Sequence, residues 1–163
     1  EQRGLGDNTL VVFTTDHGDM MGDHGFMAKG APHYDGCIRT PLLVWGGWVA
    51  RGATDRLTCA LDFFPTFCDW AGVARDDRPP TEGRSFAAAC RGEAEEQPWA
   101  EVAVSSIGSQ SVVTDDGWRL TRYLDAGQGQ MFHLRDDPHE QRNLYADPAL
   151  APKRQELLER LIA

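Results

Sequence analysis

Long apolar runs and an excess of basic residues are both missing from this 163-residue sequence. No run approaches the roughly 20 residues that span a bilayer, and the first residues do not have the pattern of a signal peptide. The 16 lysines and arginines are outnumbered by 25 acidic residues, which gives a net charge of -9. This balance argues against nucleic acid and against an anionic membrane surface as partners. It does not exclude a small anionic substrate, because a metal ion or a lysine sets the local charge of a site.

Cysteine pairs with the spacing of a metal site or a redox motif are missing as well. The four cysteines are Cys37, Cys59, Cys68 and Cys90, and three of them have apolar neighbours. We therefore expect reduced, structural thiols, with a disulfide as the alternative. Unpaired thiols favour a cytoplasmic location, but the sequence otherwise leaves the compartment open. It also leaves homo-oligomer formation open.

Two short apolar, β-branched runs lie in the first third of the chain, at residues 9–15 and 41–45. Neither alternates cleanly, so we expect strands that are covered on both faces, as in a parallel sheet. A helix is expected at residues 63–71, capped by Asp62. Two buried strands are too few for a stable doubly wound sheet. Residues 1–75 are therefore expected to be the end of a larger α/β domain.

The pattern changes after the segment 74–85, whose composition is typical of a linker. Four short β-type runs are then separated by segments that contain glycine; they are residues 101–105, 111–114, 118–123 and 130–134. This pattern predicts a small antiparallel sheet. A last helix, beginning near Pro152, carries apolar residues on one side and is expected to cover one face of that sheet. Residues 76–163 are therefore predicted to form a second subdomain.

The segment richest in ionisable side chains follows the first predicted strand. Asp16 and His17 come directly after that strand, at the edge where open α/β sheets bind ligands. A carboxylate and an imidazole beside the flexible Gly18 have the chemistry to bind one divalent cation. Two ligands are too few, and no acidic cluster of the sequence supplies the others. The spacing also fits a plainer alternative, in which Asp16 caps a turn and His17 is exposed.

Three further residues of the same loop carry chemistry. Lys29 lies in a Gly-containing segment with apolar neighbours, where its charge can neutralise a sulfate or phosphate group. His24 and His33 can each donate a hydrogen bond to a substrate oxygen. Taken alone, the lysine is better explained as a solvated surface residue. Each histidine is better explained as a loop residue bonded to backbone.

Several linked motifs cover nearly the whole chain in order. Residues 8–47 combine a strand, Asp-His-Gly, a loop with a lysine, and Ile-Arg-x-Pro-Leu. The segments "DFFPTFCDWAGV", "EGRSF" and "MFHLRDDPHEQRNLYADP" follow. Together these motifs resemble the C-terminal half of the sulfatase family, within the alkaline-phosphatase-like superfamily. The resemblance implies the C-terminal part of an alkaline-phosphatase-like α/β/α sandwich, followed by a small antiparallel four-stranded sheet with a C-terminal helix.

The resemblance also implies roles for the loop residues. Asp16 and His17 would be two ligands of a divalent cation, which is usually calcium in sulfatases, with manganese or zinc as alternatives. Lys29 would contact the sulfate oxygens, and His24 would be a neighbour of the metal site or of the substrate.

The nucleophile of the family is absent from this sequence. Family enzymes use a formylglycine made from the cysteine of a Cys-x-Pro-x-Arg motif, and none of the four cysteines has this context. The paired aspartates that complete the metal shell of the family are also absent. We therefore expect an N-terminal part of the same enzyme to supply both. Alone, the chain is expected to bind metal poorly, to be inactive, and to self-associate through uncovered apolar sheet edges.

The favoured activity of the intact enzyme is hydrolysis of a small-molecule sulfate ester. The first alternative is a phosphodiester or phosphonate monoester hydrolase of the same superfamily, and the second is a non-catalytic accessory module. Joint retention of Asp16, His17 and Lys29 argues against the module. The resemblance also assigns Asp35 and Arg39 to support of the loop, as an ion pair.

Overall fold

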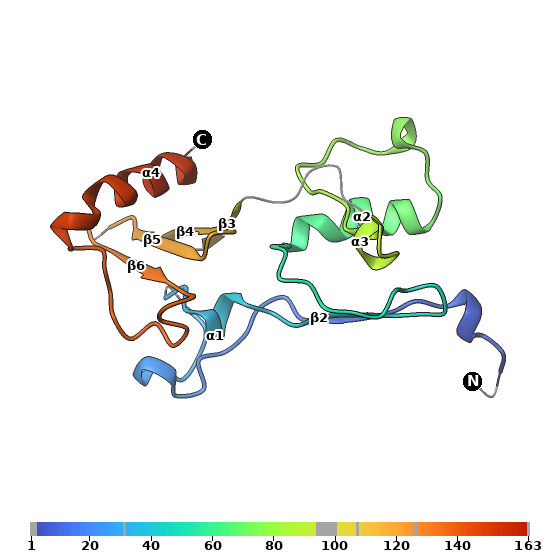
Figure 1. Ribbon diagram of the computed structural model, residues 1–163, viewed down its shortest axis with the longest axis horizontal. Helices are drawn as coiled ribbons and strands as arrows, with labels where there is room; N and C mark the ends of the chain where they lie inside the picture. Colours follow the sequence, from blue (N-terminus) through green and yellow to red (C-terminus); the bar gives the residue numbers. More distant parts are fainter. Residues whose placement is uncertain (1–2, 31, 94–100, 107, 126, 163) are drawn as a thin grey trace. The chain divides into compact units, whose positions relative to one another are not determined.

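The computed structural model describes residues 3–30, 32–93, 101–106, 108–125 and 127–162. Contacts group the chain into two compact units (Figure 1). Unit 1 comprises Glu1–Asp16 and Pro41–Trp99, and unit 2 comprises His17–Thr40 and Ala100–Ala163. The boundary that we predicted from composition lies near residue 75. The contacts instead assign the segment 17–40 to the C-terminal sheet.

Unit 1 contains the first two apolar runs as a pair of strands. β1 (Val11–Thr14) and β2 (Leu42–Trp45) are antiparallel, with Val11 opposite Trp45 and Phe13 opposite Leu43. The expectation of a parallel arrangement is therefore wrong for these two strands. The expectation of burial on both faces is also wrong within the described residues, where these four side chains are 48%, 60%, 61% and 59% exposed. A continuous apolar run indicates two apolar faces, but it does not determine strand direction or what covers each face.

The helix expected after the second strand is present as α2 (Phe63–Trp70). Asp62 precedes it, but its carboxylate does not cap this helix. It is fully buried and accepts the backbone N–H of Cys59 at 2.8 Å and that of Arg84 at 2.9 Å. The same aspartate therefore closes the turn before the helix and holds a segment 22 residues further along the chain.

The end of the linker-like segment 74–85 packs back onto α2. Thr66 accepts the backbone N–H of Phe86 at 3.0 Å through its hydroxyl, just before α3 (Ala87–Cys90). A Cβ atom on Gly83 would lie 2.0 Å from the carbonyl oxygen of Leu61, so only glycine fits there. Composition alone does not reveal this packing, because polar, Gly- and Pro-rich segments are common both in linkers and in ordered loops.

Unit 2 contains the predicted antiparallel sheet, in the strand order β3-β4-β5-β6. The strands are β3 (Glu101–Ser106), β4 (Ser109–Thr114), β5 (Trp118–Tyr123) and β6 (Gly129–His133). Each strand pairs with the next in antiparallel register. The four-stranded sheet is therefore confirmed, because alternating β-type runs with short Gly-containing turns strongly favour hairpins.

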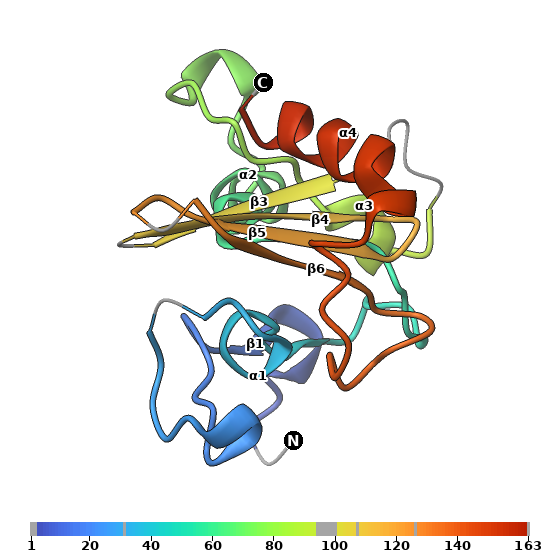
Figure 2. The ribbon, with the colours of Figure 1, turned by 90° about the vertical axis from the view of Figure 1, so that its left-hand side faces the viewer.

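The helix α4 (Ala151–Ile162) lies along one face of this sheet, as predicted (Figures 1 and 2). Val112, Leu120 and Met131 point to this face and pack with Leu157 of the helix; all four are at most 1% exposed. Within the described part of the chain, no helix is long and apolar enough to cross a membrane.

The opposite face of the sheet is more polar and binds the segment 17–40 (Figure 2). Phe132 packs there with three residues of that segment, which are Met20, Tyr34 and Cys37. His33 is buried on the same face. Its Nδ1 lies 2.6 Å from the hydroxyl of Ser111, and its Nε2 lies 3.1 Å from that of Ser109. These contacts are the reason why the segment belongs to unit 2.

The "DPHEQRNL" segment after β6 is held by two side chains. Asn143 accepts the N–H groups of Met131 and Tyr145 at 3.0 Å each, and it donates to the carbonyl of Gly129 at 3.1 Å. Asp137 accepts the N–H of Gln141, and the bonds to its carboxylate hold its pKa below the ordinary value. The aspartate and the asparagine of the motif therefore act on the backbone of their own loop.

The buried imidazole of His33 leads to a prediction about pH. Burial lowers the pKa of His33 from 6.5, and the charge of Arg119 acts in the same direction. Below about pH 6.5 the unfolded chain therefore binds a proton that the folded chain does not, and stability falls as the pH falls. We expect the free energy of unfolding, measured by denaturant titration, to decrease between pH 7.5 and 5.5. His33→Gln should reduce this decrease, and His139→Gln, at an exposed position, should not. An unchanged slope in His33→Gln would contradict the assignment.

Candidate active site

Asp16 and His17 lie just after β1, which ends at Thr14, one residue earlier than the end of the predicted run 9–15. Asp16 is exposed and ends the first segment of unit 1, whereas His17 is half-buried and begins unit 2. The Asp16 carboxylate accepts a hydrogen bond from the hydroxyl of Thr15 at 3.1 Å. A carboxylate and an imidazole are thus presented by consecutive residues at the end of a strand.

His17 and Lys29 are brought together by the loop that they begin and end. The Nδ1 atom of His17 lies 3.0 Å from the carbonyl oxygen of Gly18. A carbonyl can only accept, so Nδ1 carries the proton in this contact and Nε2 presents its lone pair. The ammonium of Lys29 lies 2.6 Å from Nε2. The backbone N–H of Lys29 donates to the carboxylate of Asp19 at 2.8 Å, which fixes the far end of the loop.

Gly18 sets the position of His17 against the helical turn α1 (Asp35–Ile38). Its N–H donates to the carbonyl of Cys37 at 2.7 Å. A Cβ atom at this position would lie 2.0 Å from the carbonyl oxygen of Gly36. The glycine of the Asp-His-Gly triplet is therefore required by a close approach of two backbones.

His24 is not part of the His17–Lys29 pair. It is exposed, has a φ of 51°, and stacks on the ring of Tyr34 with ring centres 3.8 Å apart. It lines a cleft of about 340 Å³ together with Asp23, His139 and Glu140. The cleft and Lys29 both belong to unit 2. The role of His24 beside a substrate stays a prediction.

His33 has a structural place in this molecule. It is 2% exposed, and the hydroxyls of Ser109 and Ser111 occupy its two ring nitrogens. The hypothesis that it donates to a substrate oxygen therefore has no support in the structure. The plainer alternative holds in a modified form, since the partners are side chains and not backbone.

The donor chemistry of Asp16 and His17 fits part of a metal site. Carboxylate oxygens such as those of Asp16 bind calcium or manganese. The lone pair on Nε2 of His17 is of the kind that binds zinc. Among the residues that the structure describes, no three His, Cys, Asp or Glu side chains are grouped so that they could hold an ion. Any cation held by these two residues would need further ligands.

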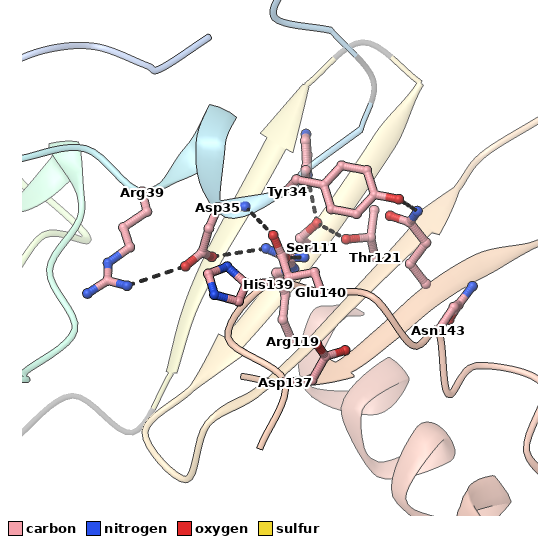
Figure 3. Close-up of polar contacts among 12 residues, drawn as sticks. Tyr34, Asp35, Arg39, Ser111, Arg119, Thr121, Asp137, His139, Glu140 and Asn143 are labelled. Carbon is pink, nitrogen blue, oxygen red and sulfur yellow. Dashed lines mark hydrogen bonds and ion pairs between the residues drawn. The ribbon is translucent and has the colours of Figure 1, made fainter. Parts of the chain in front are cut away.

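Two residues that support the loop were missed by sequence reasoning. The ion pair between Asp35 and Arg39 is present at 3.4 Å, as expected. Asp35 also binds the buried guanidinium of Arg119 at 3.1 Å, and Glu140 binds the same guanidinium (Figure 3). Arg119 lies in the alternating strand "WRLTRY", where a basic residue is usually read as solvent-facing. The only signal was Glu140, which matches the glutamate of the tail motif.

Comparisons with known proteins identify relatives in sequence and in fold. The family model described as Sulfatase matches residues 1–73. Choline-sulfatase of Rhizobium meliloti is 32% identical over 145 residues, which is 87% of this chain and 28% of the relative. A solved 2-O GAG sulfatase has a TM-score of 0.84 at 28% identity, over 98% of this chain and 37% of its own. The phosphonate monoester hydrolase of Agrobacterium radiobacter has a TM-score of 0.79 at 26% identity, over 99% and 36% of the two chains.

The shared architecture defines the class first: the chain has the fold of the corresponding part of alkaline-phosphatase-like hydrolases, which confirms the predicted fold class. Within that class, the chain belongs to the sulfatase family. It spans between 28% and 37% of the length of the proteins just described.

The close approach at Gly18 gives a prediction about the loop. Gly18→Ala would place a methyl group on the backbone of Gly36 and should lower the free energy of unfolding by about 1–3 kcal/mol. Gly30→Ala is the matched control in the same loop, since a Cβ atom there would meet its nearest neighbour at 3.7 Å. Denaturant titration of both variants checks this, and equal stabilities would show that the backbones do not approach as described.

Proposed function

We propose that the chain is the C-terminal part of a metal-dependent sulfatase-type hydrolase that cleaves sulfate esters. The observation that carries the proposal is the His17–Lys29 pair, in which Nζ and Nε2 are 2.6 Å apart in the loop after β1. A pure scaffold has no chemical need for an ammonium beside an imidazole at a strand end. Membership of the sulfatase family and the sulfate esters named by relatives such as choline-sulfatase support the substrate class.

Lys29 is assigned to the anionic part of the substrate. Its ammonium is an exposed point charge and can bind the oxygens of a sulfate group. A cation fixed beside the reacting group stabilises charge that develops in the transition state and holds the group in line for attack. The bond from its backbone N–H to Asp19 limits the freedom of the residue and so preorganises that charge.

Asp16 and His17 are assigned as two ligands of a divalent cation, with calcium favoured and manganese or zinc as alternatives. Such a cation, when bound, polarises the ester and neutralises charge on the transferred group. The Nε2 lone pair that accepts from Lys29 in the structure is the one that would bind the ion. The remaining ligands are assigned to the rest of the enzyme, as is the formylglycine nucleophile. The chain alone should therefore show no turnover.

A phosphorus ester is the alternative substrate, because the structure of a phosphonate monoester hydrolase matches 99% of this chain. Sulfate and phosphonate groups both present anionic oxygens that a lysine can bind. Comparison of 4-nitrophenyl sulfate with 4-nitrophenyl phenylphosphonate on the complete enzyme separates the two. The second alternative, an accessory module without catalysis, requires that the complete protein hydrolyses neither ester.

The role of Lys29 is tested by Lys29→Ala in the complete enzyme. Loss of one preorganised charge at the reacting group should lower kcat/KM for 4-nitrophenyl sulfate by about 100- to 1000-fold. The control is Lys153→Ala, which removes a lysine of α4 that pairs with Asp116 and with Glu156 of the same helix. The control should retain activity. Equal activities in wild type and Lys29→Ala would overturn the assigned role.

A further inference from the structure

An ion-pair network lies on the polar face of the four-stranded sheet of unit 2 (Figure 3). Arg119 of β5 is 0% exposed, and its guanidinium donates to the carboxylate of Asp35 at 3.1 Å. The same guanidinium pairs with Glu140. Glu140 in turn accepts the backbone N–H of Asp35 at 2.9 Å. Three segments that are far apart in the sequence therefore meet at one buried charge.

Burial of these charged side chains carries a desolvation penalty in free energy. Burial lowers the pKa of Arg119 to about 10, so the group remains charged at neutral pH and its desolvation must be offset. The two carboxylates offset it, and the rings of Tyr34 and Phe132 lie 5.8 and 5.2 Å from the guanidinium carbon. Apolar side chains of similar volume often fill such a space with equal or greater stability. Unlike apolar side chains, the charged groups make directed bonds that fix the orientation of the turn at Asp35.

The backbone of Glu140 points to the same conclusion. Its φ is 55°, in the left-handed region that non-glycine residues rarely adopt. This conformation costs free energy and persists where surrounding contacts determine it. Here the contacts are those of the side chain to Arg119 and to the N–H of Asp35. The residue is only 5% exposed.

The anchored turn is also the support of His17. Asp35 begins α1, and the carbonyl of Cys37 in the same turn accepts the N–H of Gly18, next to His17. Tyr34, directly before Asp35, carries the stacked ring of His24. Displacement of the turn would therefore move the carbonyl that holds Gly18, next to His17, and the ring on which His24 stacks.

We propose that Arg119 and Glu140 are positioning residues for the His17–Lys29 pair. They hold the turn at Asp35 on the sheet, and the turn holds the loop that carries the pair. The catalytic consequence rests on the proposed function, because it requires that Lys29 binds the substrate anion. The mechanical part does not, since it concerns only the order of the loop.

Glu140→Gln is the variant that tests the proposal with the least change of shape. One carboxylate oxygen of Glu140 pairs with the guanidinium of Arg119 and the other accepts the N–H of Asp35, whereas an amide is uncharged and has only one acceptor oxygen. We expect amide hydrogen exchange at Gly18 and Lys29 to become at least about tenfold faster, because loss of the anchor favours local opening. Exchange at Val112 and Leu120 in the sheet should change less than about twofold. General destabilisation would instead accelerate all four amides together, and that result would overturn the proposal.

A matched control and a second variant make the test independent of one substitution. Arg160→Gln removes a surface arginine of the same unit that pairs with Glu101 and Glu156, and it should leave exchange at Gly18 unchanged. Arg119→Lys keeps the charge but loses the fork that reaches two carboxylates. It should accelerate exchange at Gly18 as Glu140→Gln does. Unchanged exchange at Gly18 in both network variants would overturn the proposal.

Activity of the complete enzyme separates this proposal from the proposed function. If the wild-type enzyme hydrolyses one of the two test esters, kcat/KM for that ester should fall in Glu140→Gln. It should remain at the wild-type value in Arg160→Gln. If wild type hydrolyses neither ester, the proposed function fails, and hydrogen exchange alone decides the positioning role. A loop that opens in Glu140→Gln while kcat/KM is unchanged would overturn the catalytic part.

Discussion

The buried guanidinium of Arg119 is the interaction on which the arrangement of unit 2 depends. It is shared by Asp35 and Glu140, which lie 84 residues before it and 21 residues after it in the chain. A buried charge tolerates little displacement of its partners, because each lost contact leaves an uncompensated ion in a medium of low dielectric constant. The contacts at Arg119 therefore define where the first segment of the unit lies on the sheet, and not merely that it lies there.

The sheet of unit 2 uses its two faces for different purposes. One face is apolar and packs with Leu157 of α4, which is the ordinary source of stability for a small sheet. The other carries hydroxyls and Arg119 among its side chains and binds the segment 17–40 through His33 and Tyr34. Alternation along the strands produces this division, since successive side chains point to opposite faces. A single small sheet thus serves both as a core and as a platform for the loop of the candidate site.

We assign the candidate site to a catalytic centre of which this chain holds a part. His17 and Lys29 form a compact pair, and Asp16 supplies a carboxylate, but neither a nucleophile motif nor a third ligand group accompanies them among the described residues. Glycine at position 18 allows the close approach that holds this pair near α1. Bonds within unit 2 therefore hold the loop that carries His17 and Lys29. The nucleophile and the remaining metal ligands are the groups that we assign to the rest of the enzyme.

The sequence by itself determined the local elements: the hairpins of the C-terminal sheet, the terminal helix and the family to which the loop motif belongs. These follow from periodicity, turn residues and motif spacing, which act over a few residues. It did not determine the antiparallel pairing of β1 with β2, the burial of His33, or the role of Arg119, to which the sequence alone assigned no contact. Those features were decided by tertiary structure, because direction, burial and ion pairing depend on partners that are distant in the chain and that no local pattern encodes.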